Sequence, residues 1–171
     1  MSIIAPAKTI TVGIVVERSK GAGPWTDFLW RPVSAFGGIP QTPPWTKLSD
    51  DGERATFFVG TVEVELYRSE AGNYRHNLLV ENPLLWVALR PTEAEPPYVL
   101  AGVTVDPAEG ESWAALGKDL IDTVTMPAAV EAVVADFVSE HYVEQPFHKR
   151  KRDRAEPEVL ARRPPADVGK S

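Results

Sequence analysis

Alternation of apolar and polar residues in two segments constrains the fold of this 171-residue chain more than any other feature. In residues 10–18 the apolar positions are Ile10, Val12, Ile14 and Val16. In residues 56–68 the apolar positions alternate with Glu63 and Glu65. A period of two is typical of strands that bury one face and expose the other, as strands of antiparallel sheets do. The two segments therefore predict a half-buried antiparallel sheet.

Shorter apolar runs predict the rest of the sheet. Further strands are expected at 28–35, at 84–90 and, as the last strand, at 98–105. Residues 71–73 are predicted to turn the chain so that residues 74–80 form a hairpin with the strand at 56–68. A short helical turn is expected at 107–117, around Trp113. Several strands followed by one helix favour an α+β fold, with an antiparallel sheet or small barrel of about five to seven strands.

The clearest helix begins near Met126. Pro127 suits the first helical turn, where its missing N–H leaves no hydrogen bond unmade, and Thr125 is the expected N-cap. The residues that recur at helical spacing are Val130, Val133, Val134, Phe137, Val138, His141 and Tyr142. Pro146 is expected to end the helix. The pattern predicts a C-terminal amphipathic helix that packs this stripe against the sheet.

Length and composition favour one domain without disulfides. The chain has no cysteine, which excludes disulfides, thiolate nucleophiles and cysteine-based zinc sites. Residues 1–9 lack the apolar core of a signal peptide, and no apolar run approaches the ~18 residues of a transmembrane helix. We therefore expect a cytoplasmic protein with no membrane partner. It would consist of a flexible N-terminus (1–9), one globular domain (10–148) and a basic, proline-containing disordered tail (149–171).

The net charge of −6 is divided unevenly between the domain and the tail. Residues 149–171 carry eight of the 18 Lys and Arg residues and four of the 24 Asp and Glu residues. Residues 1–148 therefore hold ten basic and twenty acidic residues. An acidic domain argues against a nucleic-acid-binding face, because contact with phosphates needs clustered Lys and Arg.

The histidines do not form a persuasive metal site. His141 and His148 flank the helix end, with Glu140 and Glu144 nearby. Pro146 breaks the helical face that these residues would share, and a metal site needs three or four converging ligands. We therefore expect no metal, and His141 is interpreted as a helix-terminus histidine.

No other segment predicts catalysis. Glu63 and Glu65 have a spacing that general acid–base chemistry uses, but the same pattern is typical of a solvated strand face. The glycines of 21–24 lack the following helix and the Lys-Ser/Thr pair of a phosphate-binding loop. We therefore expect no catalytic residue and no cofactor, and a protein that is not an enzyme.

The five tryptophans divide into two groups. Trp30 and Trp86 are expected in the core, because large aromatic residues dominate cores. Trp25 and Trp45 stand beside proline and glycine, and suit the core and an exposed recognition surface equally.

The basic run at 149–154 admits three interpretations: a solvated tail, a contact to nucleic acid or anionic lipid, or a docking segment for an acidic protein. The candidate binding residues at this junction are Pro146, Phe147, His148, Lys149, Arg150, Lys151, Arg152 and Arg154.

Two blocks of sequence resemble a bacterial family known as domain of unknown function 3305. The first block comprises residues 13–18, Trp25 and residues 30–33, and the second comprises Met126-Pro127 and residues 144–154. Genes of that family tend to lie beside those of molybdenum-dependent formate dehydrogenases and their maturation factors. The resemblance therefore implies an accessory role and carries no catalytic residues with it.

Three functions follow as expectations. The first is a non-enzymatic accessory protein that assists the assembly or regulation of a molybdenum-dependent formate dehydrogenase by binding one of its subunits or maturation factors. The second is a small-molecule or cofactor-binding domain, with or without weak catalysis, which a deep pocket lined by Trp25, Trp30 or Tyr67 would support. Nucleic-acid binding through the tail is the weakest of the three.

Overall fold

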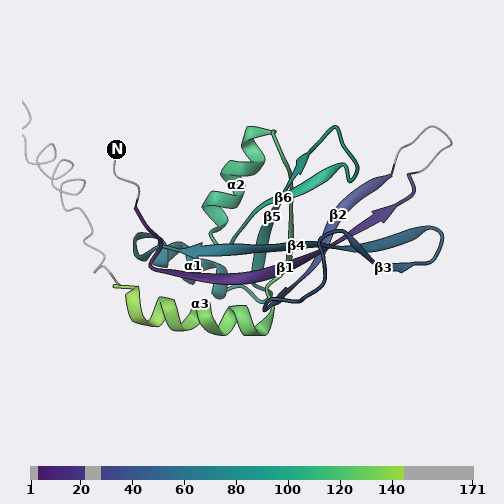
Figure 1. Ribbon diagram of the computed structural model, residues 1–171. Coiled ribbons are helices and arrows are strands. Elements are labelled where there is room, and N and C mark those ends of the chain that lie inside the picture. Colours follow the sequence, from purple (N-terminus) through teal and green to yellow (C-terminus); the bar gives the residue numbers. More distant parts are fainter. Residues whose placement is uncertain (1–3, 22–27, 145–171) are drawn as a thin grey trace, which may run out of the picture.

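The longest pairing in the fold joins the two segments that alternate most clearly. The computed structural model describes residues 4–21 and 28–144 (Figure 1). Strand β1 (Lys8–Ser19) pairs antiparallel with β4 (Arg54–Leu66) along its whole length. Strands β2 (Leu29–Gly37) and β3 (Thr46–Asp50) extend this sheet in the order β2-β1-β4-β3. Val12, Ile14 and Val16 have no exposed surface, which confirms the predicted inner face.

A second antiparallel sheet packs against the first. Its order is β6-β5-β7, formed by β5 (Leu84–Pro91), β6 (Tyr98–Thr104) and β7 (Leu120–Thr125). Strand β6 lies against β4 (Figure 1). Strand β7 lies against β2. The strands of the described ranges form two sheets rather than a closed barrel. The fold is therefore α+β with seven described strands, as the sequence predicts. Of the two expected architectures, antiparallel sheet and small barrel, the structure has the antiparallel sheets.

The C-terminal helix α3 (Ala128–His141) covers the core with the predicted stripe. Val130, Val134, Phe137 and Val138 are buried in the same cluster as the inner face of β1. The start of the helix differs from the prediction, because Pro127 is the N-cap residue and Thr125 is the last residue of β7. The helix also ends at His141, before Pro146, which lies outside the described residues.

The predicted hairpin strand at 74–80 is wrong, and so is the turn at 71–73. A short 3-10 helix (Arg68–Glu70) leads directly into helix α1 (Ala71–Leu78). Ala71, Tyr74 and Asn77 are its buried residues, three positions apart on one face. The buried Asn77 side chain donates to the carbonyls of Leu84 and Val105 and accepts from the Leu84 N–H. These remote partners stabilise a helix in a segment whose local composition also suits a strand.

Helix α2 (Pro107–Leu116) confirms the helical prediction around Trp113, and the strand that follows it was not predicted. Asp106 caps α2 by accepting hydrogen bonds from the Ala108 and Glu109 N–H groups. After α2 the chain returns as β7, so β6 is not the last strand. Strand β3 was not predicted either, because four of its five residues are exposed and it has no apolar alternation.

Candidate functional site

The inner face of β1 carries a cation, Arg18, near the C-terminal end of the strand. Val16 is buried like Ile14, beyond the register shift between Ile14 and Val15, so the alternation of β1 continues and places Arg18 on the side that holds Val12, Ile14 and Val16. Arg18 pairs with Trp30 of β2 on one side and with Ala55 of β4 on the other. Paired residues of antiparallel strands point to the same face. The guanidinium therefore lies on the face that is apolar farther along the strand.

Three aromatic rings surround this guanidinium. Its Cζ atom lies 4.4 Å from the centroid of Phe28, 5.2 Å from that of Phe57 and 5.9 Å from that of Trp30. A cation at these distances over aromatic faces is attracted by the ring quadrupoles, by about 0.5–1 kcal/mol where the site is exposed. Within the described residues Arg18 forms no ion pair and no side-chain hydrogen bond.

Trp45 completes the aromatic group from the connection that precedes β3. Its indole packs edge-on against Trp30, with centroids 5.8 Å apart and an interplanar angle of 76°, and lies 6.0 Å from Phe57. The backbone N–H of Trp45 donates to the Phe58 carbonyl at 2.5 Å. Its φ of 66° lies in the left-handed region, which costs about 1–2 kcal/mol for a residue with a Cβ. Trp45 is partly buried, so it belongs to the rim of the core and also borders solvent.

These side chains line a cavity of about 530 Å³, which we call the aromatic hollow. It lies between the inner face of the four-stranded sheet and the connection from β5 to β6. Its lining residues are Arg18, Phe28, Trp30, Trp45, Phe57, Glu95, Pro96 and Pro97. Ligand pockets typically have volumes of roughly 300–1,000 Å³, are mostly apolar and carry few polar groups. The aromatic hollow therefore has the size and composition of a binding site.

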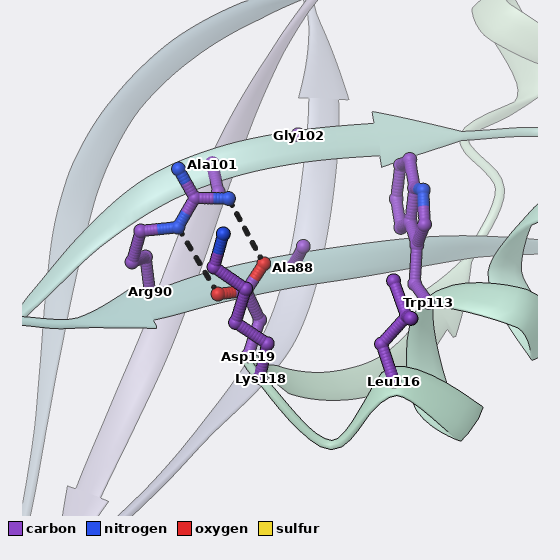
Figure 2. Close-up of a pocket in the computed structure, with 8 residues that line it drawn as sticks. All are labelled: Ala88, Arg90, Ala101, Gly102, Trp113, Leu116, Lys118 and Asp119. Atoms are coloured by element: carbon purple, nitrogen blue, oxygen red, sulfur yellow. Dashed lines mark hydrogen bonds and ion pairs between the residues drawn. The ribbon is translucent and has the colours of Figure 1, made fainter.

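A second hollow, of about 270 Å³, lies where α2 crosses the outer face of β5 and β6 (Figure 2). Its lining residues are Ala88, Arg90, Ala101, Gly102, Trp113, Leu116, Lys118 and Asp119. The Arg90 Nε and Nη2 atoms donate to the two Asp119 carboxylate oxygens at 3.1 and 3.2 Å. These hydrogen bonds raise the pKa of Arg90. Asp119 occupies donors of Arg90, and Lys118 is the lining cation that forms no ion pair within the described residues. The aromatic hollow is the larger of the two, at about 530 Å³.

Glu63 and Glu65 lie in an acidic groove between β4, β6 and α2. Glu63 accepts a hydrogen bond from the Thr11 hydroxyl, and Glu65 accepts one from the Tyr67 hydroxyl, both at 2.5 Å. The bond to Glu65 raises the pKa of Tyr67. Both carboxylates thus have local hydrogen-bond partners on the solvated side of the sheet, which fits a solvated strand face better than an acid–base pair.

Comparison with known proteins assigns the chain to a family. The family model described as "Protein of unknown function (DUF3305)" matches residues 11–151. The chain belongs to the DUF3305 family. No curated protein and no solved structure matches this chain. Every residue that lines the aromatic hollow falls within the DUF3305 match, as does the start of the basic run.

Of the binding residues that the sequence predicts, the structure places one. Trp45 lies in the aromatic hollow, whereas Trp25 and all eight residues of the tail junction from Pro146 to Arg154 lie outside the described residues. Trp30, expected in the core, is partly buried and packs against it. Trp86 was expected there too, but it lies on the opposite face of β5 from the buried Leu85 and Val87, against Gly110 of α2.

The structure brings no metal ligands together around the described histidines. His141 packs against Phe137, with ring centroids 4.5 Å apart, and its Nε2 atom lies 3.8 Å from a Glu140 oxygen. The described parts of the chain contain no group of three or more His, Cys, Asp or Glu side chains placed to share an ion. No helix of the described residues is long and apolar enough to cross a membrane.

Arg18, Phe28 and Phe57 are the site residues that sequence reasoning missed. The signal for Arg18 was present, because it continues the alternation of Val12, Ile14 and Val16 by one step. A cation at an inward position requires a local reason, such as aromatic faces that receive it. The rings that supply this reason come from other strands, so the alternation of β1 alone does not identify them.

Proposed function

We propose that this DUF3305 chain is a non-enzymatic accessory protein that works by binding a partner protein. The observation that carries the proposal is the aromatic hollow, in which Trp30, Trp45 and Arg18 lie side by side next to solvent. Tryptophan and arginine are the residue types most enriched among those that dominate the energy of protein interfaces. The rim adds Phe28, which lines the hollow with 47% of its surface exposed.

The basic junction from Pro146 to Arg154 is the second proposed contact. Its charge is opposite to that of the domain, and a short basic run accelerates association with an acidic surface. The partner would therefore present acidic groups to this segment.

The proposed partner is a subunit or a maturation factor of a molybdenum-dependent formate dehydrogenase. This identification rests on the gene neighbourhood of the family, which is an association and not a mechanism. The decisive measurement is the maturation of formate dehydrogenase in cells that lack this gene. Loss of mature enzyme, restored by the full-length chain, is the expected result, and unchanged maturation would remove formate dehydrogenase from the proposal.

Affinity capture tests the contribution of the junction. The full-length chain and a chain ending at Gln145 would be compared as baits for the same formate dehydrogenase components. We expect the truncated bait to recover less, and to lose the salt sensitivity that a basic segment confers. Equal recovery by both baits at every salt concentration would exclude the junction from the contact.

A small-molecule-binding domain is the second candidate. The volume of the aromatic hollow and the presence of Trp30 in its lining favour this candidate. Native mass spectrometry of the purified full-length protein distinguishes the two candidates. A stoichiometric bound small molecule would favour the second, whereas the mass of the bare chain would favour protein binding.

A further inference from the structure

The end of the four-stranded sheet that carries the aromatic hollow differs in charge from the rest of the domain. It lies beyond the β5-β6-β7 sheet in Figure 1, where β1, β2, β3 and β4 approach their connections. Of the ten basic residues among 1–148, five belong to this end: Arg18, Lys20, Arg31, Lys47 and Arg54. This end therefore concentrates positive charge in a domain whose net charge is −10.

Two of these five cations are neutralised locally. Arg31 pairs with Glu17 at 3.3 Å, and Lys47 pairs with Asp50 at 2.8 Å. The remaining three form no ion pair within the described residues. Among them only Arg18 lines the aromatic hollow. Glu95 also lines it, but these two described side chains form no ion pair, so the hydrogen-bond donors of Arg18 are available.

The aromatic rings fix the orientation of this cation. With Phe28, Phe57 and Trp30 around it, the Arg18 guanidinium is held on apolar surface while its N–H edges have no acceptor in the described part of the chain. A planar guanidinium held in this way matches the two oxygens of a carboxylate and binds them through paired hydrogen bonds. The hollow therefore combines a carboxylate-binding group with aromatic walls for an adjacent apolar group.

We propose that the aromatic hollow binds an acidic segment of a partner protein, in which an Asp or Glu carboxylate pairs with Arg18 and a neighbouring aromatic side chain packs against Trp30, Trp45 and Phe57. This inference rests on the proposed protein-binding function and names the chemistry of the partner. Phe28, which lines the hollow, is 47% exposed, so the apolar surface of the hollow extends to its rim. A small ligand inside the hollow leaves this surface uncovered, whereas a segment of protein covers it.

Peptide binding tests the inference directly. The probe is the capped peptide acetyl-Gly-Asp-Phe-Glu-Phe-Gly-amide carrying a fluorophore, titrated with the full-length protein and followed by anisotropy. Two matched peptides replace either the acidic residues by Asn and Gln or both Phe residues by Ala. We expect each replacement to weaken binding by about tenfold or more, because one removes the charged hydrogen bonds and the other the ring contacts. Equal affinity of the Asn/Gln peptide would overturn the proposal.

Substitutions on the protein locate the site. Arg18→Gln is expected to weaken binding of the acidic peptide by about tenfold, and Arg18→Lys is expected to recover only part of it, because a lysine keeps the charge without the planar fork. Arg31→Gln is the matched control, since Arg31 lies on the same end but is paired with Glu17. Equal losses for the variants of Arg18 and Arg31 would show a diffuse charge effect and overturn the assignment to the hollow.

Other occupants give different outcomes. If phenylacetate displaces the peptide at concentrations similar to that of the peptide itself, the hollow is a site for small carboxylates and the proposal is wrong. The tail of this chain contains Glu156-Pro157-Glu158-Val159-Leu160, which is also acidic and apolar. If a chain ending at Gln145 binds the peptide more tightly than the full-length chain, the tail is the occupant and the proposal is wrong.

The capture experiment separates this inference from the proposed function. Full-length Arg18→Gln bait that recovers formate dehydrogenase components as well as the unmodified chain would reject the hollow and leave the accessory function standing. Peptide binding that depends on Arg18, together with normal formate dehydrogenase maturation in the deletion strain, would support the hollow as a binding site and reject the role in formate dehydrogenase maturation.

Discussion

Trp45 holds a backbone conformation that no other non-glycine residue of the described ranges adopts. Its φ of 66° is maintained by the hydrogen bond to Phe58 and by ring contacts with Trp30 and Phe57. Strained residues of this kind persist where the surrounding packing determines them, and they are frequent at binding sites. The strain at Trp45 therefore agrees with its place in the aromatic hollow.

Replacing Trp45 by glycine and by alanine separates the strain from the ring contacts. Both variants lose the same ring, but only glycine adopts the left-handed conformation without a steric cost. We expect Trp45→Gly to have a free energy of unfolding higher than that of Trp45→Ala by about 1 kcal/mol, measured in urea. Trp30, in strand β2 without a positive φ, is the control, and there the alanine variant is expected to be the more stable. The same order at both positions would contradict the argument.

Tyr74 confers a dependence of stability on alkaline pH. Its phenol is buried, accepts a hydrogen bond from the Tyr67 N–H, and has its pKa raised by burial to about 12. The protonated phenol is therefore favoured in the folded state, and its contribution is complete below the ordinary pKa of about 10 and is lost between pH 10 and 12. The linked loss is about 2–3 kcal/mol for a rise of this size.

Comparison with Tyr74→Phe isolates this contribution. The variant is expected to be less stable at pH 8, because the Tyr67 N–H loses its acceptor, and to lose less stability than the unmodified chain between pH 10 and 12. Chemical unfolding at each pH provides the measurement. Parallel pH profiles of the two proteins would show that Tyr74 does not titrate in this range.

At the scale of elements, the packing of α2 on β5 depends on one glycine. A Cβ on Gly110 would lie 2.2 Å from Cγ and 2.7 Å from Cβ of Trp86. Because a Cβ atom cannot rotate away, the helix itself would have to move. Gly110 thus occupies the interior of a helix, where glycine is ordinarily unfavourable, because only glycine allows this approach.

Gly110→Ala is therefore expected to destabilise the protein by about 1–3 kcal/mol, despite the higher helix propensity of alanine. Gly72→Ala in α1 is the matched control, since its Cβ would have no neighbour closer than 3.8 Å. That variant is expected to be neutral or more stable by up to about 1 kcal/mol. Thermal unfolding of both measures the contrast, and similar changes in Tm would contradict the packing argument.

Asn77 connects three elements through one buried amide. It binds Leu84 at the start of β5 and the Val105 carbonyl between β6 and α2, from its place in α1. Asn77→Ala leaves these buried groups unpaired, and we expect a loss of about 2–4 kcal/mol, measured by urea unfolding. A loss below about 1 kcal/mol would mean that water replaces the amide.

For the whole molecule, the composition of the tail predicts that it does not contribute to the stability of the domain. A chain ending at Gln145 lacks all of residues 149–171 and with them the basic surplus of the tail. We expect its Tm to match that of the full-length chain within about 2 °C, because a segment with few large apolar residues buries little surface. A larger drop would place part of the tail against the domain.

The prediction of the fold succeeded where the pattern is local. The alternation in β1 and the stripe of α3 depend only on spacing, and both are buried as predicted. The prediction was wrong where groups that are remote in the sequence decide the secondary structure. Residues 74–78 lie in helix α1 because Asn77 binds Leu84 and Val105, and β3 forms because β4 offers it an edge. In the aromatic hollow, Trp45 is a residue that the sequence left open between core and exposed surface, and Arg18 is one that the sequence analysis did not single out.

The sequence by itself determined which faces are apolar, where the last helix lies and how charge divides between domain and tail, because each depends on neighbours along the chain. Only the tertiary structure decided that two sheets remain open and that Arg18 meets Phe28 and Phe57. The physical reason is that a cation–ring contact depends on distances across strands. Strand register sets those distances, and it is established only when the sheets pack.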